Sequence, residues 1–191
     1  FLPKGTTISM RWTYDNSEAN ERNPNHPPKR VLAGNKASDE MSHFWIQVLP
    51  RREEDRTILQ EALVRQKLRK YPRDFDSNLS LGAVLQSTGR LQEAIASYRR
   101  AVAIRPGDPL AQNNLGAALL STGLSEAKLD EAIGHFRESV KSRPDYIDAQ
   151  YNLANALLAR GSAPEAAKHF LLILDIEPED ADAHDQLGSA Y

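Results

Sequence analysis

The spacing of four prolines is the feature that most limits how this chain can fold. Pro72, Pro106, Pro144 and Pro178 follow one another at intervals of 34, 38 and 34 residues. Proline ends a helix, because it lacks the N–H of a helix interior and clashes with the preceding turn. A period of this length predicts a stack of repeated helical pairs, each of which buries its apolar face against its neighbours.

Small residues and aromatic rings recur at fixed places within this period. The small residues of the first helices are Gly82, Gly116, Ala154 and Gly188, and the rings of the second helices are Tyr98, Phe136 and Phe170. Glycine inside a helix costs about 1 kcal/mol relative to alanine, so its recurrence indicates that the two helices approach closely, with the ring filling the gap beside it. A further glycine lies between the two helices, where a left-handed residue is expected to end the first one: Gly89, Gly123 and Gly161.

This pattern resembles the tetratricopeptide repeat, a helix–turn–helix unit of about 34 residues. Leu81-Gly82 with Leu85, and Ala94 with Tyr98, carry the resemblance, together with their counterparts in the later periods. It implies a mainly α fold, a right-handed superhelix of three repeats (75–108, 109–146 and 147–180) and a partial fourth (181–191). One departure is at the fourth position of each first helix, where the family usually has an aromatic residue and this chain has Asn78, Gln112, Gln150 and His184.

The second repeat is longer than the others by four residues, Leu124–Ala127. Four residues are close to one helical turn of about 3.6, so the insertion can lengthen the second helix without rotating its apolar face. A longer loop between the two helices is the alternative.

Residues 51–74 are expected to form a linker and a capping helix. Ile58, Leu59, Ala62 and Leu63 have helical spacing from about Glu53 onward, and Pro72 stops the pattern at the same phase as the later prolines. We therefore expect this helix to stack on the first repeat.

Residues 1–50 have a different character. Ile8, Met10, Trp12 and Tyr14 alternate with polar residues, which indicates a half-buried strand, and residues 41–49 are apolar on both faces. Two or three strands are not stable alone. This segment is therefore predicted to be the C-terminal strands of a truncated β-sandwich.

The end of this segment resembles the copper type II ascorbate-dependent monooxygenases, the peptidylglycine and dopamine hydroxylating family, and in particular bacterial relatives that continue into tetratricopeptide repeats. Residues 34–41, the strand 42–49 and Pro50 carry the resemblance to the family, and residues 14–17 with the Asn-rich loop after them carry the resemblance to its bacterial relatives, some of which have such repeats. It implies that Met41 is a copper ligand in the intact parent, a role that suits a soft thioether, although ordinary core packing is the alternative for a methionine. Ser42 stands where the animal enzymes have cysteine, and the histidine ligands of such a site are not in this chain.

No enzyme signature occurs in the repeats, so no catalytic residue or cofactor is assigned to this segment itself. His135 and His169 share one position of the second helices, but no carboxylate joins them at ligand spacing, and a solvated outer face is expected for both. Asn114 and Asn152 share one position of the first helices. There they can bond the backbone of an extended peptide, a neighbouring helix or solvent.

By resemblance, the first helices line a groove that binds a protein or peptide. The predicted partner-binding residues are Leu79, Ala83, Gln86, Asn113, Ala117, Leu120, Asp148, Tyr151, Asn155 and Leu158, with Asp76 and Leu110 near its start and Asp182, Asp185 and Ser189 near its end. The groove lacks the Lys and Arg set with which chaperone-binding members hold a C-terminal carboxylate, so chaperone docking is disfavoured.

Composition narrows the classes of function that remain. A net charge of −2 gives no reason to expect nucleic acid as a partner, no apolar run is long enough to span a bilayer, and the absence of cysteine excludes disulfides and thiolate metal sites. We expect the natural protein to continue beyond Tyr191 and the uncapped last helix to self-associate. The sequence thus predicts an interaction scaffold. The alternative is part of a copper-dependent hydroxylase with its catalytic residues upstream, for which the resemblance suggests a periplasmic or secreted location.

Overall fold

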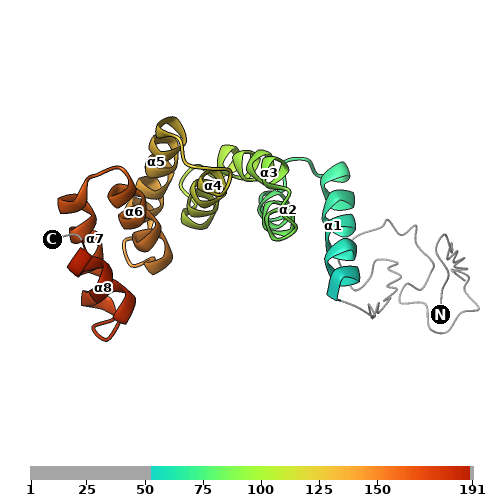
Figure 1. Ribbon diagram of the computed structural model, residues 1–191. Helices are drawn as coiled ribbons and strands as arrows, with labels where there is room; N and C mark the ends of the chain where they lie inside the picture. Colours follow the sequence, from blue (N-terminus) through green and yellow to red (C-terminus); the bar gives the residue numbers. More distant parts are fainter. Residues whose placement is uncertain (1–52, 190–191) are drawn as a thin grey trace, which may run out of the picture. The chain divides into compact units, whose positions relative to one another are not determined.

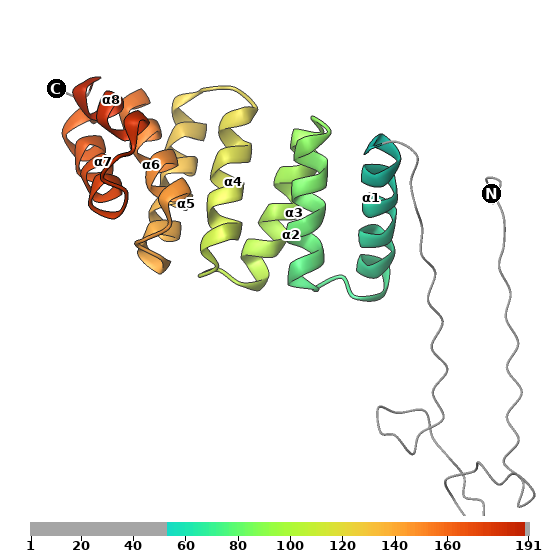
Figure 2. The same ribbon diagram turned by 90° about the horizontal axis from the view of Figure 1, so that it is seen from below.

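The computed structural model describes residues 53–189, and within them the chain forms eight helices. In chain order they are α1 (Glu53–Lys70), α2 (Phe75–Ser87), α3 (Leu91–Ile104), α4 (Pro109–Ser121), α5 (Glu126–Ser142), α6 (Ile147–Ala159), α7 (Ala163–Ile176) and α8 (Ala181–Ser189). The helices stand beside one another in chain order (Figures 1 and 2). The strands predicted in residues 1–50 lie outside the described residues.

The loop after each second helix both ends that helix and starts the next one. Each of the four prolines is followed two residues later by the residue that precedes a first helix. In three of these loops that residue is aspartate, and its carboxylate accepts a backbone N–H of the new helix at 2.9 Å: Asp74, Asp108 and Asp180. Such caps satisfy N–H groups that have no partner inside the helix. The turn glycines have positive φ, as predicted, with Gly89 at 75°.

Rings from the second helices sit on the glycines of the first helices, as the sequence predicts. A Cβ atom added to Gly82 would lie 2.4 Å from the Tyr98 ring, and one added to Gly116 would lie 2.6 Å from the Phe136 ring. Tyr98, Phe136 and Phe170 are each no more than 1% exposed. The rings and glycines therefore set how closely the two helices of a repeat approach.

The extra residues of the second repeat go mainly into its second helix. Helix α5 has 17 residues, whereas α3 and α7 have 14 each. The preceding loop, residues 122–125, is one residue longer than its counterpart at residues 88–90. Both alternatives therefore contribute, with three residues in the helix and one in the loop.

The polar residues at the fourth position of the first helices hold those helices to the proline loops. Gln112 Nε2 donates to the Pro106 carbonyl at 2.6 Å, and Gln150 Nε2 donates to the Pro144 carbonyl at 2.7 Å. Asn78 and His184 make the same bond to Pro72 and Pro178. These amide and imidazole groups thus give the proline carbonyl of each loop a side-chain partner.

Ion pairs at one repeated position join each second helix to the next. The guanidinium groups of Arg65, Arg99 and Arg137 lie 3.0, 2.8 and 2.7 Å from the carboxylates of Glu93, Glu131 and Glu165, respectively. Arg65 belongs to α1, so α1 occupies the place of a second helix and packs on α2. In α7 the equivalent residue is Leu171, which is 50% exposed.

The two sets of helices pack differently along the array. Among the described residues, the backbone of α4 comes close to those of α2 and α6, whereas the backbones of α3, α5 and α7 do not come close to one another and these helices meet only through side chains. The first helices are therefore closer together than the second helices, and the array curves toward the first helices.

Candidate partner-binding face

The first helices lie on the inner side of this curve, and each of them contributes side chains to the surface there. We call this surface the first-helix face and define it by the following residues of α2, α4, α6 and α8. Its exposed members are Asp76, Ala83, Leu110, Asp148, Asn155, Asp182, Asp185 and Ser189. Its half-buried members are Leu79, Gln86, Ala117, Leu120, Tyr151 and Leu158.

Asn113, which was predicted to face the groove, is buried instead. It is 5% exposed, and its Oδ1 accepts a hydrogen bond from Asn152 Nδ2 at 2.8 Å. The Tyr146 hydroxyl also interacts with Asn113 and with the carboxylate of Asp148; burial above all, and then this carboxylate, raises the pKa of Tyr146. Asn113 and Asn152 thus join α4 to α6. Of the partners considered for Asn152 from its sequence position, the structure shows a neighbouring helix.

Gln86 is also engaged within the fold. Its Oε1 accepts the Tyr98 hydroxyl at 2.9 Å, so the ring that packs on Gly82 keeps its polar end satisfied. The side chains of the face that remain for a partner are therefore mainly leucine, alanine and aspartate, together with Asn155.

Tyr151 links the face to the last helix. Its hydroxyl donates to Asp180 Oδ1 at 2.5 Å, and the same oxygen caps α8 by accepting the N–H of Ala183 at 2.9 Å. The Tyr151 ring meets Phe170 edge-on, with 6.1 Å between the ring centroids. Burial and the bond to Asp180 raise the pKa of the Tyr151 hydroxyl, while the hydroxyl holds the pKa of Asp180 below its usual range.

Replacing Tyr151 with Phe is expected to loosen α8 without disturbing the earlier repeats. The variant keeps the ring contact but removes the donor that holds the cap of α8, so amide hydrogen exchange across residues 181–189 should become severalfold faster. Tyr146→Phe is the matched control. It removes a tyrosine hydroxyl directly before α6, the helix that contains Tyr151, and leaves the bond to Asp180 in place. Equal exchange in α8 for the wild-type protein and Tyr151→Phe would show that the hydroxyl does not anchor this helix.

The two histidines of the second helices are half-buried and hydrogen-bonded, whereas a solvated position was expected. The Nδ1 atoms of His135 and His169 lie 2.7 Å from the Oε1 atoms of Gln112 and Gln150. Because each glutamine Nε2 already donates to a proline carbonyl, Oε1 accepts and Nδ1 carries the proton. Each imidazole therefore extends the chain of bonds that begins at the proline loop. In the first repeat Ser97 replaces histidine, and Asn78 Oδ1 has no hydrogen-bond partner among the described residues.

We expect this arrangement to make the fold less stable in mild acid. Burial lowers the pKa of His135 and of His169 from the ordinary value of 6.5. The folded state therefore favours the neutral imidazoles. Their contribution to the free energy of unfolding is complete above about pH 6.5 and is lost as the pH falls toward the lowered pKa values of the folded state. The thermal midpoint should fall between about pH 7 and pH 5, and the double variant His135→Gln/His169→Gln should show a flatter profile. An identical slope in the two proteins would assign the acid sensitivity elsewhere.

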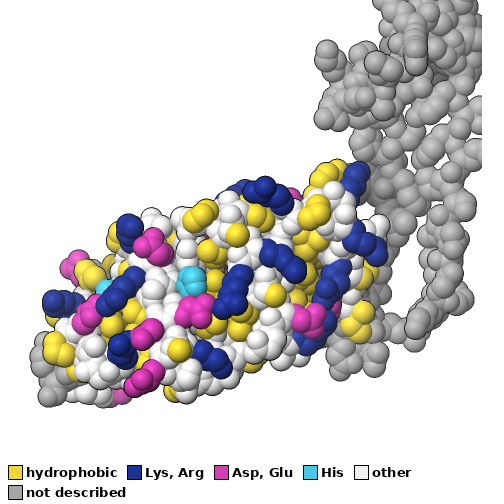
Figure 3. Space-filling model, turned by 90° about the horizontal axis from the view of Figure 1, so that it is seen from above, with side chains coloured by type: hydrophobic (Ala, Val, Ile, Leu, Met, Phe, Trp, Pro, Cys, Tyr) yellow, Lys and Arg dark blue, Asp and Glu magenta, His cyan; other side chains and the backbone are white. Residues whose placement is uncertain are grey.

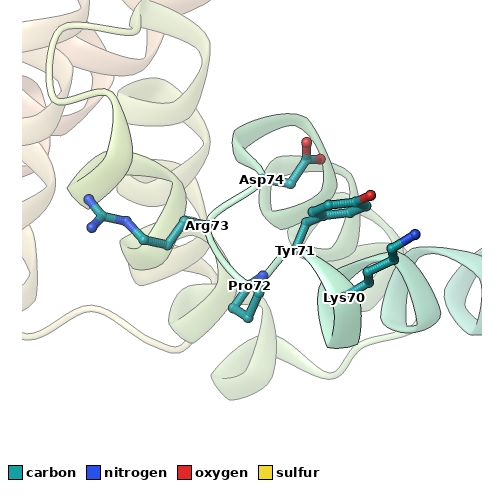
Figure 4. A pocket seen from close by; sticks show the side chains of 5 residues that line it. All are labelled: Lys70, Tyr71, Pro72, Arg73 and Asp74. Carbon is teal, nitrogen blue, oxygen red and sulfur yellow. The ribbon is translucent and has the colours of Figure 1, made fainter. Parts of the chain in front are cut away.

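One surface cavity of the described residues does not bring together the side chains of a ligand site. A cavity of about 660 Å³ lies at the loop between α1 and α2, lined by Lys70, Tyr71, Pro72, Arg73 and Asp74 (Figure 4). The Arg73 side chain points away from Tyr71 and Lys70, and the Asp74 carboxylate is engaged as the cap of α2 and as the partner of Lys67 at 2.9 Å. These side chains do not converge on one point, so we assign no ligand to the cavity.

Neither a metal site nor a membrane-spanning helix occurs within residues 53–189. His, Asp and Glu side chains there form no group that could hold a metal ion. None of the helices described combines the length and the apolar character needed to cross a bilayer. Met41 lies outside the described residues, and its role as a copper ligand stays a prediction.

Comparison with known proteins identifies the repeats. Two profiles of the same repeat family match the chain, one described as TPR repeat over residues 82–123 and one described as tetratricopeptide repeat over residues 123–188. No curated protein matches the chain in sequence.

Several solved structures share the fold. One structure of MamA superposes with a TM-score of 0.66 at 21% identity, covering 72% of this chain and 73% of MamA. A second MamA structure gives 0.65 at 21% identity and covers 76% and 85%. A tetratricopeptide repeat protein from Parabacteroides merdae gives 0.63 at 18% identity and covers 72% of this chain and 55% of its own. Identities this low show the fold alone. The two profiles together identify residues 82–188 of this chain as tetratricopeptide repeats.

Proposed function

We propose that the chain is a protein-interaction scaffold whose first-helix face binds an extended segment of a partner. The observation that carries this proposal is the exposed character of the face. Leu110 is 40% exposed, and Ala83 and Asn155 are exposed on the neighbouring first helices. Apolar and amide side chains that the fold leaves uncovered along one continuous surface are suited to a peptide, which needs apolar contact for its side chains and hydrogen bonds for its backbone.

The repeat architecture favours binding of this kind. An array of repeats forms an extended concave surface, and each repeat contributes the same positions at regular intervals. The family is typical of scaffolds that bind proteins in this way. The interior of the array is filled by rings and by leucine, isoleucine and alanine side chains.

The test is selection of binding peptides from a random library against the full chain, followed by blocking of the face. Asn155→Trp places a bulky ring on an exposed position in the middle of the face. Ala96→Trp places the same ring on an exposed position of the second helix α3. We expect the selected peptides to lose binding to Asn155→Trp and to keep binding to Ala96→Trp. Peptides that respond only to Ala96→Trp would place the binding surface on the second helices.

The copper-dependent hydroxylase remains the second proposal for the intact parent, and it rests on the resemblance of residues 34–50. Its discriminating experiment is copper stoichiometry and oxygen-dependent turnover of the parent and of its Met41→Ala variant. Full turnover in the Met41→Ala parent would remove Met41 from the metal site.

A further inference from the structure

Charge is divided unequally between the two sets of helices. The four first helices α2, α4, α6 and α8 contain no lysine or arginine. They carry four carboxylates, all of them exposed on the first-helix face: Asp76, Asp148, Asp182 and Asp185. The lysines and arginines of the helical segments all belong to α1 and to the second helices α3, α5 and α7.

Several carboxylates outside the first helices are paired with cations. Arg65, Arg99 and Arg137 pair with glutamates of the next helix pair, and Arg160 pairs with Asp130. On the face shown in Figure 3, basic and acidic side chains accordingly lie beside one another. In contrast, none of the ion pairs between described residues includes a side chain of α2, α4, α6 or α8. The carboxylates of the first-helix face therefore have no ion-pair partner among the described residues, and the cation nearest to Asp148 in these contacts is Arg143, which stacks on the Tyr146 ring.

Helix electrostatics explain only part of this distribution. Asp76, Asp148 and Asp182 lie in the first turns of their helices, where a negative charge is favoured by the helix dipole. The same effect favours lysine or arginine in the last turn, and the last turns of α2, α4 and α6 have none. Asp185 lies beyond the first turn of α8 and has no such role. The absence of lysine and arginine from the first helices is therefore not explained by the helix dipole, and we relate it to binding at the exposed face.

One position of the repeat makes the pattern specific. The second residues of the four first helices are Asp76, Leu110, Asp148 and Asp182, and all four are exposed. Packed helices lie about 8–10 Å apart, and an extended chain advances about 3.3 Å per residue. About three residues of an extended ligand therefore correspond to one repeat.

We infer that the first-helix face binds an extended basic segment of a partner protein, with side chains in the order basic, apolar, basic, basic at intervals of about three residues. The apolar residue of the ligand meets Leu110, and the basic residues meet the carboxylates on either side. Leu120, Leu158 and the alanines of the face contact the residues between them. This inference deepens the proposed function and depends on it.

The test compares three peptides that differ only at the charged positions. The probe has Lys, Leu, Lys and Lys at every third position, with serine and proline between them, and its counterparts carry Gln or Glu in place of Lys. Binding to the full chain is measured by fluorescence anisotropy at low and at physiological salt. We expect the Lys peptide to bind most tightly and to weaken with added salt, the Gln peptide to bind less tightly, and the Glu peptide least.

Paired substitutions test where the selectivity arises. Asp148→Asn/Asp182→Asn should weaken the Lys peptide about fivefold to twentyfold at low salt and leave the Gln peptide unchanged. The control Glu138→Gln/Asp175→Asn removes the same net charge from the second helices and should have no effect on either peptide.

The outcomes separate this inference from the proposed function. If the three peptides bind equally, and Asn155→Trp weakens all of them, the face binds peptides without charge selection and the inference is overturned while the proposed function stands. If the control substitutions weaken the Lys peptide as much as the Asp148→Asn/Asp182→Asn pair, the attraction comes from net charge and the inference is overturned. Binding that does not respond to Asn155→Trp contradicts both.

Discussion

Replacing Phe136 with Ala is expected to lower the free energy of unfolding by about 3–5 kcal/mol. The ring is 1% exposed and lies between α4 and α5 in the middle of the array, against the Gly116 backbone. Its loss removes apolar contacts and leaves a cavity that the two helices cannot close, because the neighbouring repeats hold them apart. The cavity also lies at the centre of the array, where it weakens the coupling between the repeats on either side.

Urea denaturation of the full chain, followed by circular dichroism, measures this loss. Leu124→Ala is the matched control, because Leu124 is 72% exposed in the loop before α5 and its truncation should change stability by less than about 0.5 kcal/mol. A loss below about 1 kcal/mol for Phe136→Ala would mean that the ring does not hold the repeats together.

Gly116→Ala and Gly134→Ala are expected to change stability in opposite directions although the chemical change is the same. The new methyl group at Gly116 would lie 2.6 Å from the Phe136 ring, so α4 and α5 must separate or the ring must leave its rotamer, at a cost of about 1–3 kcal/mol. At Gly134, on the exposed side of α5, nothing lies within 4 Å, and alanine should stabilise the helix by up to about 1 kcal/mol.

A double-mutant cycle identifies the ring as the cause. In a Phe136→Leu background the smaller side chain leaves room for the methyl group, so Gly116→Ala should cost much less than it does alone. The free energies come from the same urea titrations. Destabilisation of equal size in both backgrounds would assign the cost of Gly116→Ala to something other than the ring.

The features that could be predicted from the sequence are those that recur at the same position of each repeat. Gly82 and Gly116 occupy one position of the repeat, and Tyr98 and Phe136 occupy another. A residue without a side chain on one helix and a large ring on the other predict that the ring packs against the glycine. The turn glycines were predictable for a similar reason, since a helix that ends in a left-handed residue favours glycine. These features depend on residues close in sequence or on a pattern that recurs.

The polar connections were harder to predict because they join side chains on different helices. His135 lies 23 residues from Gln112, and Asn152 lies 39 residues from Asn113. Whether such side chains meet depends on rotamers and on the crossing of helices, which hydrophobic spacing does not specify. Asn113 was assigned to the groove for this reason, since its position in the repeat is right but the loop residue Tyr146 and the next first helix cover it.

A signal for the ion pairs was nevertheless present. Arg65, Arg99 and Arg137 share one repeat position, and Glu93, Glu131 and Glu165 share another. Alignment of the helices by repeat position, rather than by apolar spacing alone, would have paired them and placed α1 as a second helix.

These pairs also determine how stiff the array is. The first helices α2, α4 and α6 approach one another directly, while neighbouring second helices are joined by long, exposed arginine and glutamate side chains. Each exposed pair contributes at most about 1 kcal/mol and weakens with salt. The layer of first helices is therefore the stiffer one, because its helices pack on one another. The layer of second helices is the more easily deformed one, because only side-chain ion pairs connect its helices. Any change in the spacing of the repeats would lengthen or shorten the row of Asp76, Leu110, Asp148 and Asp182 by the same amount, and with it the residue spacing that this row matches.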